Sequence, residues 1–275
     1  MLFVPGHVKC KAAKGEMQTE KLQRAVGAIH VRFGDQALVR ANRLPAARSW
    51  PTGQSWVDRV CGIGGLPFGR VSVLRGMPGS GKLSLALALL ARATQEFARA
   101  VAIDLRSGFD PWTLEQFGAD LGALILVRPP TPAAVGEAAV ALARAGAGFL
   151  LVLGALPEPA LAPLESAAAR SGCLVIAVAD VTGAAEAAEA DSALAFASSL
   201  TLELKHLRWL KERSQVVGLR SRMICTKNKL AAPGGEAELE VRYAMGHRLD
   251  PGELLREGQG GAQVVELWQG WSAAG

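Results

Sequence analysis

A glycine-rich stretch in the first third of the chain has the residue types and spacing of a phosphate-binding loop. Residues 76–82 read GMPGSGK, which fits the pattern G-x-x-x-x-G-K. In such a loop, backbone N–H groups turn inward around phosphate oxygens, and the lysine reaches the terminal phosphates. The residues expected to hold a nucleotide are Gly76, Gly79, Ser80, Gly81 and Lys82. The alternative is a glycine-rich turn that matches the pattern by chance. A strand is expected before the segment and a helix after it, so this alternative is the weaker interpretation.

The residues that would hold Mg²⁺ beside such a loop are missing from their expected places. Leu83 follows the lysine where a Ser or Thr hydroxyl is needed, and Ser84 is rotated by about 100° around the helix. The apolar segment 149–153 ends in Gly154 and carries no carboxylate. We therefore expect no bound metal, although two acids that follow other apolar segments could replace the missing one, Asp104 and Asp180.

The elements around the loop alternate between short apolar runs and helical patterns. Strands are expected at 71–74, 100–104, 124–127, 149–153 and 174–179, and helices at 83–97, 111–118, 132–145 and 158–170. Continuously apolar strands that alternate with helices indicate an α/β fold with a mostly parallel sheet covered on both faces. The alternating segments 200–204, 222–225 and 237–243 predict an antiparallel extension of that sheet.

Three regions are expected along the chain. Residues 1–50 form an N-terminal region with a loose leader (1–20), a helix (20–34) and a short strand (37–39), and a linker covers 41–56. Residues 51–250 form the core, and 251–275 form a glycine-rich tail.

Composition favours a soluble cytoplasmic protein. Half of the 275 residues are hydrophobic, yet no apolar stretch approaches the length of a membrane span. Cys10, Cys61, Cys173 and Cys225 are scattered, so free thiols are a better interpretation than a metal site or disulfides. The net charge of +5 gives only a mild indication of a nucleic-acid or acidic partner.

Several segments together resemble the bacterial RecA family, over roughly residues 20–255. The segment 62–70 resembles the lead-in to the RecA phosphate loop, and Pro51-Thr52-Gly53 resembles the turn before it. Further similar segments are 102–104, 109–111, 192–198 and the run KNKLAAP at 227–233. The resemblance implies a RecA-like P-loop ATPase core that binds ATP or ADP. It also implies that Asp110 lies at the adenine contact, and that Lys227 and Lys229 reach ATP on a neighbouring subunit.

The departures from the family pattern concern catalysis. Arg106 stands where the family has its catalytic glutamate, and Thr113 replaces the aromatic that stacks on adenine, with Trp112 beside it. The segment 181–191, which corresponds to a DNA-binding loop, is short and acidic. We therefore expect no catalytic residues, weak nucleotide binding without metal, and at most weak binding of single-stranded DNA.

Three functions follow as hypotheses. The first is an impaired, ImuA-type accessory protein of the SOS DNA-damage response, which binds RecA and an ImuB-like translesion polymerase partner and modulates RecA filaments. The second is a DNA-dependent ATPase that acts as a recombination mediator. The third is a DNA-binding module, whose candidate contacts could equally be a solvated sheet edge: Lys205, His206, Arg208, Lys211, Arg213, Arg220 and Arg222.

Overall fold

The computed structural model describes residues 9–34, 47–105, 107–181, 193–243 and 251–258. The chain divides into two compact units, residues 1–46 and 47–275. This division lies four residues before the boundary expected at residue 50.

The first unit contains one long helix, α1 (Lys9–Phe33). It begins within the segment 1–20 that we expected to be a loose leader, so that expectation is wrong for residues 9–20. The segment is rich in Ala, Lys, Glu and Gln, which favour helix. Gly34 ends the helix with a positive φ of 85°, as predicted. The strand expected at 37–39 lies outside the described residues.

The second unit starts with structure where the sequence suggested a linker. Ser49–Trp50 form β1, which pairs antiparallel with β2 (Leu66–Pro67), and α2 (Ser55–Cys61) lies between them in sequence. The indole of Trp50 is buried, with its ring centroid 5.4 Å from that of Phe97 and 5.5 Å from that of Phe149. This aromatic contact fixes the segment to the core, so the expected linker is wrong for residues 47–56.

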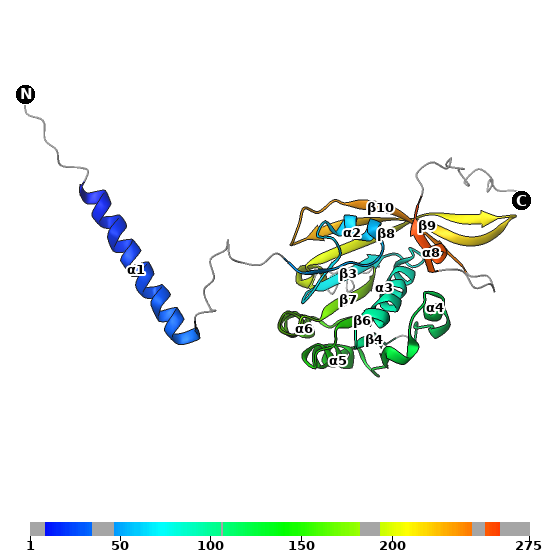
Figure 1. Ribbon diagram of the computed structural model, residues 1–275, viewed down its shortest axis with the longest axis horizontal. Helices are drawn as coiled ribbons and strands as arrows, with labels where there is room; N and C mark the ends of the chain where they lie inside the picture. Colours follow the sequence, from blue (N-terminus) through cyan, green and yellow to red (C-terminus); the bar gives the residue numbers. More distant parts are fainter. Residues whose placement is uncertain (1–8, 35–46, 106, 182–192, 244–250, 259–275) are drawn as a thin grey trace, which may run out of the picture. The chain divides into compact units, whose positions relative to one another are not determined.

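A nine-stranded sheet organises the second unit (Figure 1), in the order β11-β10-β9-β8-β3-β7-β6-β4-β5. The strands β3, β4, β5, β6 and β7 pair in parallel, as the sequence predicts. β8 also pairs in parallel with β3 and is antiparallel only to β9, so the expectation that residues 200–204 belong to the antiparallel extension is wrong for the β3 side of this strand. Their bounds are β3 (Val71–Gly76), β4 (Ala100–Asp104), β5 (Leu124–Val127), β6 (Phe149–Leu153), β7 (Leu174–Asp180) and β8 (Leu200–Glu212).

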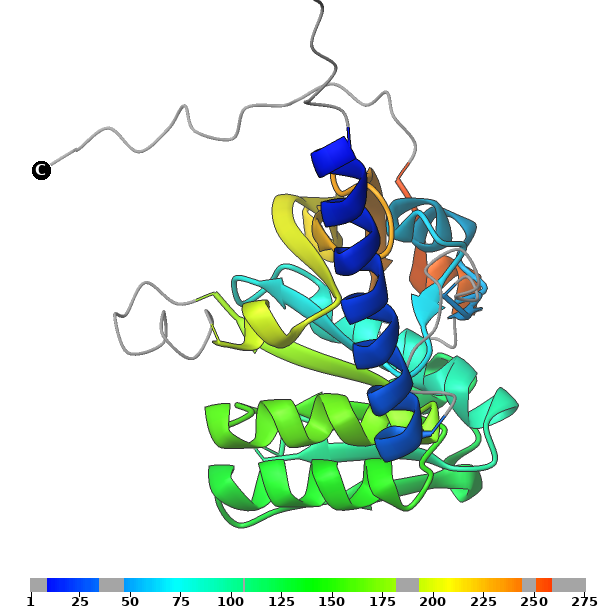
Figure 2. The same ribbon diagram turned by 90° about the vertical axis from the view of Figure 1, so that its left-hand side faces the viewer.

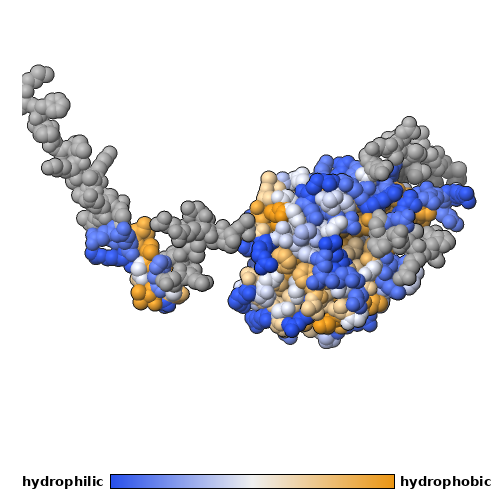
Figure 3. Space-filling view, in the orientation of Figure 1, coloured by the Kyte–Doolittle hydropathy of each residue, from blue (hydrophilic) through white to orange (hydrophobic). Residues whose placement is uncertain are grey.

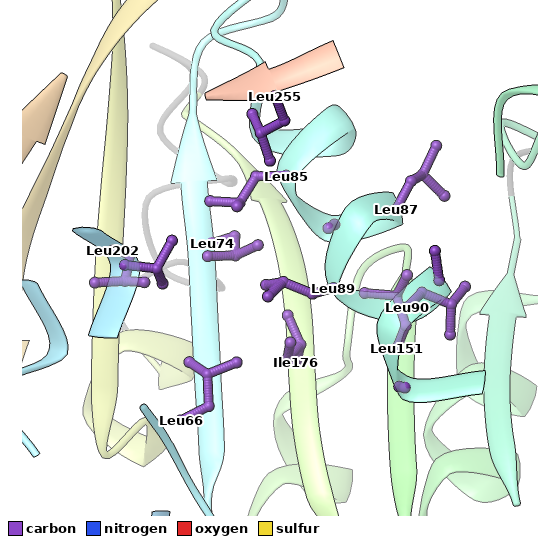
Figure 4. Packing of buried hydrophobic residues seen from close by; sticks show 14 of the residues in the cluster. Leu66, Leu74, Leu85, Leu87, Leu89, Leu90, Leu151, Ile176, Leu202 and Leu255 are labelled. Carbon is purple, nitrogen blue, oxygen red and sulfur yellow. The ribbon is translucent and has the colours of Figure 1, made fainter. Parts of the chain in front are cut away.

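Helices cover both faces of the parallel strands. One face carries α3 (Lys82–Glu96) and α4 (Pro111–Gln116), and the other carries α5 (Pro132–Arg144) and α6 (Glu158–Ser171). Figure 2 shows α5 and α6 side by side, and Figure 4 shows the leucines of α3 packed on the sheet. Alternation along β3 separates two cores: Leu74 joins the α3 side, whereas Val71 and Val73 join the α5 and α6 side.

The antiparallel extension is longer than the sequence indicated. β8 and β9 (Gln215–Asn228) form a long hairpin, and β10 (Glu236–Arg242) adds to β9. Arg213 and Ser214 turn the hairpin with φ values of 45° and 71°, the positive φ pair of a tight hairpin turn. The outer half of the hairpin is mostly exposed and rich in basic residues, so its sequence lacks the apolar alternation that predicts a strand.

The segment 251–257 is ordered structure and not part of a tail, which corrects the third expected region. α8 (Pro251–Leu254) leads into β11 (Leu255–Glu257), and β11 pairs antiparallel with β10. The buried side chain of Leu255 adds to the α3 side of the core. Residues 259–275 lie outside the described part of the chain.

The structure describes the side chains of three cysteines. Cys61, Cys173 and Cys225 are free and buried, and burial raises the pKa of the Cys173 thiol to about 12. Within the described residues, no helix is long and apolar enough to cross a membrane, and no cluster of His, Cys, Asp and Glu could hold a metal ion.

A buried ionic cluster ties the last three strands together. Glu240 on β10 is 4 % exposed, and its carboxylate accepts hydrogen bonds from Arg220 on β9 and, at 2.8 and 2.6 Å, from Arg256 on β11. Burial opposes ionisation of Glu240, but the hydrogen bonds and charges of both arginines lower its pKa below the ordinary 4.5. The ionised form therefore stabilises the folded chain.

Glu240→Gln is expected to cost about 2 kcal/mol of unfolding free energy at neutral pH, because the buried guanidinium of Arg220 and the half-exposed one of Arg256 lose the carboxylate between them. Since folding lowers the pKa of Glu240, this stabilisation is complete above the ordinary value of 4.5 and is lost as pH falls through the lowered pKa. Urea denaturation of the wild-type chain and of Glu240→Gln measures this. The difference in unfolding free energy between the two should be smaller at pH 3 than at pH 7. Glu238→Gln, whose ion pairs are longer and more exposed, is the control and should cost little. A difference of equal size at both pH values would contradict this account.

Candidate nucleotide-phosphate site

The phosphate loop lies at the edge of the sheet where the parallel strands end. It connects β3 to α3, and Asp180, Gly154 and Asp104 mark the ends of β7, β6 and β4 at the same edge. Side chains after neighbouring parallel strands therefore converge on the loop. The strand–loop–helix arrangement that the motif requires is present.

Two glycines of the loop occupy places where a side chain would clash or strain the backbone. A Cβ atom on Gly76 would lie 2.4 Å from the Leu204 carbonyl oxygen and 2.6 Å from the Ser80 hydroxyl oxygen. Gly81 caps α3 at a φ of 81°, and a Cβ there would press against Leu219 at 3.1 Å. The loop is thus packed tightly against β8 and β9, and its backbone geometry depends on glycine.

Polar groups of the loop are arranged for an anion. The Ser80 hydroxyl is fully buried and has no hydrogen-bond partner within the described residues. Lys82 is 7 % exposed, and its ammonium donates to the Met77 carbonyl at 3.1 Å. The amino end of α3 adds its partial positive charge. These groups fit the phosphates of a nucleotide.

The same edge does not fit a magnesium ion. Leu83 is 38 % exposed where a hydroxyl ligand would be needed. A Cβ on Gly154 would lie 3.0 Å from the Cβ of Leu105, so an apolar side chain fills the direction that an acid would take. No step of a metal-assisted reaction can be built from these residues.

The two acids considered as replacements have other partners. Asp104 is buried, and its two carboxylate oxygens accept the backbone N–H groups of Gly108 and Phe109 at 3.2 and 2.9 Å. It therefore shapes the loop after β4. Asp180 forms a salt bridge with Lys82, with 2.7 Å between Oδ1 and Nζ.

Asp110, expected at the adenine contact, serves as the N-cap of α4. Its carboxylate accepts the N–H groups of Trp112 and Thr113 at 3.1 and 3.0 Å, and the hydrogen bond from the Thr113 hydroxyl lowers its pKa. The indole of Trp112 is 53 % exposed and free to contact a base. Arg106, the residue at the position of the family's catalytic glutamate, lies outside the described residues.

Lys227 and Lys229 lie at the opposite edge of the sheet. Lys227 pairs with Thr201 at the start of β8, whereas the phosphate loop adjoins the position of Leu204, further along that strand. Both ammonium groups donate to the Phe196 carbonyl at 2.9 Å, and Lys227 also donates to the Ala195 carbonyl. The structure therefore separates these lysines from the phosphate loop of their own chain.

Two aromatic residues also lie near these sites. Phe196 is 83 % exposed beneath both lysines, with ammonium-to-ring distances of 5.9 and 5.7 Å. The indole of Trp209 on β8 lies beside the phosphate loop, 4.0 Å from where a Cβ on Gly79 would be. Phe196 belongs to the RecA-like segment 192–198, whereas Trp209 lies in no motif, and only the strand register reveals its place beside the loop.

The fold and the loop define a P-loop protein with an α/β core. The family model described as the RecA N-terminal domain matches residues 20–168. Protein RecA of Brucella anthropi is 29 % identical over 288 residues, which covers 92 % of this chain and 79 % of that protein. Protein RecA of Blastochloris viridis is 30 % identical over 288 residues, covering 92 % and 82 %. The chain belongs to the RecA family.

Proposed function

We propose that this chain is a RecA relative that does not hydrolyse ATP and that caps RecA filaments at one end. The observation that carries the proposal is the difference between the two edges of its sheet. One edge presents Lys227, Lys229 and the exposed ring of Phe196. The other presents a phosphate loop without metal ligands. In a head-to-tail array each subunit offers two different faces, so a subunit with one functional face ends the array.

The lysine edge would complete the nucleotide site of a RecA subunit from outside. Both ammonium groups are held on carbonyls at the end of the short helix 193–197, which keeps them close together on one surface. Burial and the neighbouring charge of Lys229 lower the pKa of Lys227, which favours an anionic partner for these groups. A triphosphate on an adjoining subunit has that chemistry.

The test is the length of RecA filaments. RecA from the same organism, assembled on single-stranded DNA with a slowly hydrolysed ATP analogue, would be mixed with the chain at substoichiometric ratios. Electron microscopy should show shorter filaments as the ratio rises, with the chain at one end. Filaments of unchanged length, or chain distributed along them, would contradict capping.

As part of the same proposal, the chain acts in the DNA-damage (SOS) response as an ImuA-type accessory protein in the cytoplasm, with an ImuB-like translesion polymerase partner. Support comes from the RecA-type core together with the missing metal ligands. Affinity capture with the tagged chain from cells treated with a DNA-damaging agent tests this part. Recovery of neither RecA nor a polymerase-like protein would count against it.

Nucleic-acid binding is a second candidate function, favoured by the β8–β9 hairpin. The hairpin extends from the sheet (Figure 1), and its surface is largely hydrophilic (Figure 3). Trp209 is 46 % exposed and lies against His206 with ring centroids 4.6 Å apart. Aromatic side chains among basic ones suit a single strand. The partly or fully exposed basic residues toward the turn of the hairpin are Lys205, Arg208, Lys211, Arg213 and Arg222, whereas Arg220 is buried against Glu240.

We expect this binding to be weak, with a dissociation constant of about 10⁻⁶ to 10⁻⁴ M that rises steeply with salt. Trp209→Ala should weaken it about tenfold by removing one stacking platform. Fluorescence anisotropy with a labelled oligothymidine measures both effects. Trp112→Ala, which removes an exposed indole on α4, is the matched control. Equal losses in the two variants would show that the hairpin is not the contact.

A further inference from the structure

Asp180 is placed beside the phosphate loop by the register of two parallel strands. It is the last residue of β7 and pairs directly with Gly76, the first glycine of the loop. The next residue, Val181, donates its N–H to the Gly76 carbonyl at 3.1 Å. The backbone therefore holds the carboxylate at the entrance to the loop.

The Asp180 carboxylate is paired with Lys82, the cation that a bound phosphate group would need. Its Oδ1 lies 2.7 Å from the Lys82 ammonium, whose side chain is 9 % exposed, whereas that of Asp180 is 33 % exposed. Lys82 also donates to the Met77 carbonyl. A phosphate group must share or displace these contacts and approach an acid of the same charge.

We propose that Asp180 determines which anions the phosphate loop accepts, by neutralising Lys82 and repelling polyphosphates that arrive without a divalent cation. This inference concerns the chain's own loop and does not depend on docking to RecA. The wild-type loop then binds a free nucleoside diphosphate weakly because its lysine is already paired, although its glycine backbone fits phosphate.

Asp180→Asn is the direct test, because it removes the charge and keeps the size of the side chain. Isothermal titration with ADP in EDTA should show at least about tenfold tighter binding to Asp180→Asn than to the wild-type chain, since a charge-assisted contact becomes available. Adding Lys82→Met to the same variant should abolish the gain. The gain in ADP affinity should also diminish as the concentration of potassium chloride is raised.

Glu203→Gln is the matched control. Glu203 lies on β8, the other strand that flanks β3, and its carboxylate is 3.7 Å from Arg75 and 3.4 Å from Lys205. The Glu203→Gln variant loses the same charge close to the loop, but Lys82 stays paired with Asp180. ADP affinity should therefore change little in this variant, which separates a specific pairing from general repulsion.

A second measurement uses stability. Asp180→Asn leaves a nearly buried ammonium without its carboxylate, so inorganic phosphate should raise its melting temperature more than that of the wild-type chain. Circular dichroism at low temperature checks that both proteins are folded.

Three outcomes would overturn the proposal. One is equal ADP affinity in the wild-type chain and Asp180→Asn, and another is no binding by either. The third is a loss of affinity on substitution that occurs only with Mg²⁺, which would make Asp180 a metal ligand. No RecA is present in the assay, so these outcomes are distinct from a failure of filament capping.

Discussion

Purified chain is expected to release phosphate from ATP no faster than buffer alone, with or without single-stranded DNA. The reason is the set of side chains that surround the phosphate loop at the ends of the parallel strands. Leu83 offers no hydroxyl, Leu105 fills the space beside Gly154, and Asp180 holds Lys82. Loss of a general base alone typically lowers a rate by about 10² to 10⁴. Loss of metal charge neutralisation adds to that.

A coupled phosphate-release assay, run beside RecA from the same organism, measures this directly. Lys82→Ala is the control, because any true turnover at this site requires the loop lysine. Identical traces for the wild-type chain and Lys82→Ala are expected. DNA-stimulated turnover that disappears in Lys82→Ala would favour the alternative, a DNA-dependent ATPase that acts as a recombination mediator.

Replacing both Lys227 and Lys229 by Ala is expected to weaken binding to ATP-bound RecA filaments by about 100-fold, because each ammonium loses a charge-assisted contact with phosphate worth at least tenfold in affinity. The effect should be much smaller for filaments without nucleotide. Surface plasmon resonance on immobilised filaments gives both affinities.

Lys205→Ala with Lys211→Ala is the matched control for this pair. It removes the same charge from the β8 strand, at the other edge of the sheet. Since Lys227 and Lys229 also bond the carbonyls of helix 193–197, thermal melts must show that the variant remains folded. RecA binding that is independent of both lysines would place the contact elsewhere on the chain.

The sequence predicts the bounds of β3, β4, β5, β6 and β7 to within two residues, but it assigns the start of β8 to the antiparallel extension. β4, β5 and β6 have the predicted bounds, because strands buried on both faces are apolar throughout and stand out from their flanking turns. The outer hairpin was underestimated, since one half of it faces solvent with basic residues. The pairing of β11 with β10 was missed because a three-residue strand carries no periodic signal.

The site was predictable in part. The glycine loop follows from a local motif, and the structure gives it the expected position. The pairing of Lys82 with Asp180 joins residues far apart in sequence, and it depends on β7 lying next to β3 in one register. Sequence alone offered Asp180 only as a metal ligand. The carbonyls that hold Lys227 and Lys229 depend in the same way on the contact between β9 and helix 193–197.

The contact between Leu105 and position 154 bears on how an acidic residue could arise at that position during evolution. An aspartate that arose at 154 would place its Cβ 3.0 Å from that of Leu105, so the leucine would have to shift or be replaced as well. Neighbouring substitutions of this kind are not additive, and the first one alone brings a packing cost without a catalytic benefit. Selection would therefore act against the first substitution because of its packing cost. Leu105 thus makes an acid at position 154 depend on a second substitution, so the two changes would have to arise together or with the change at Leu105 first.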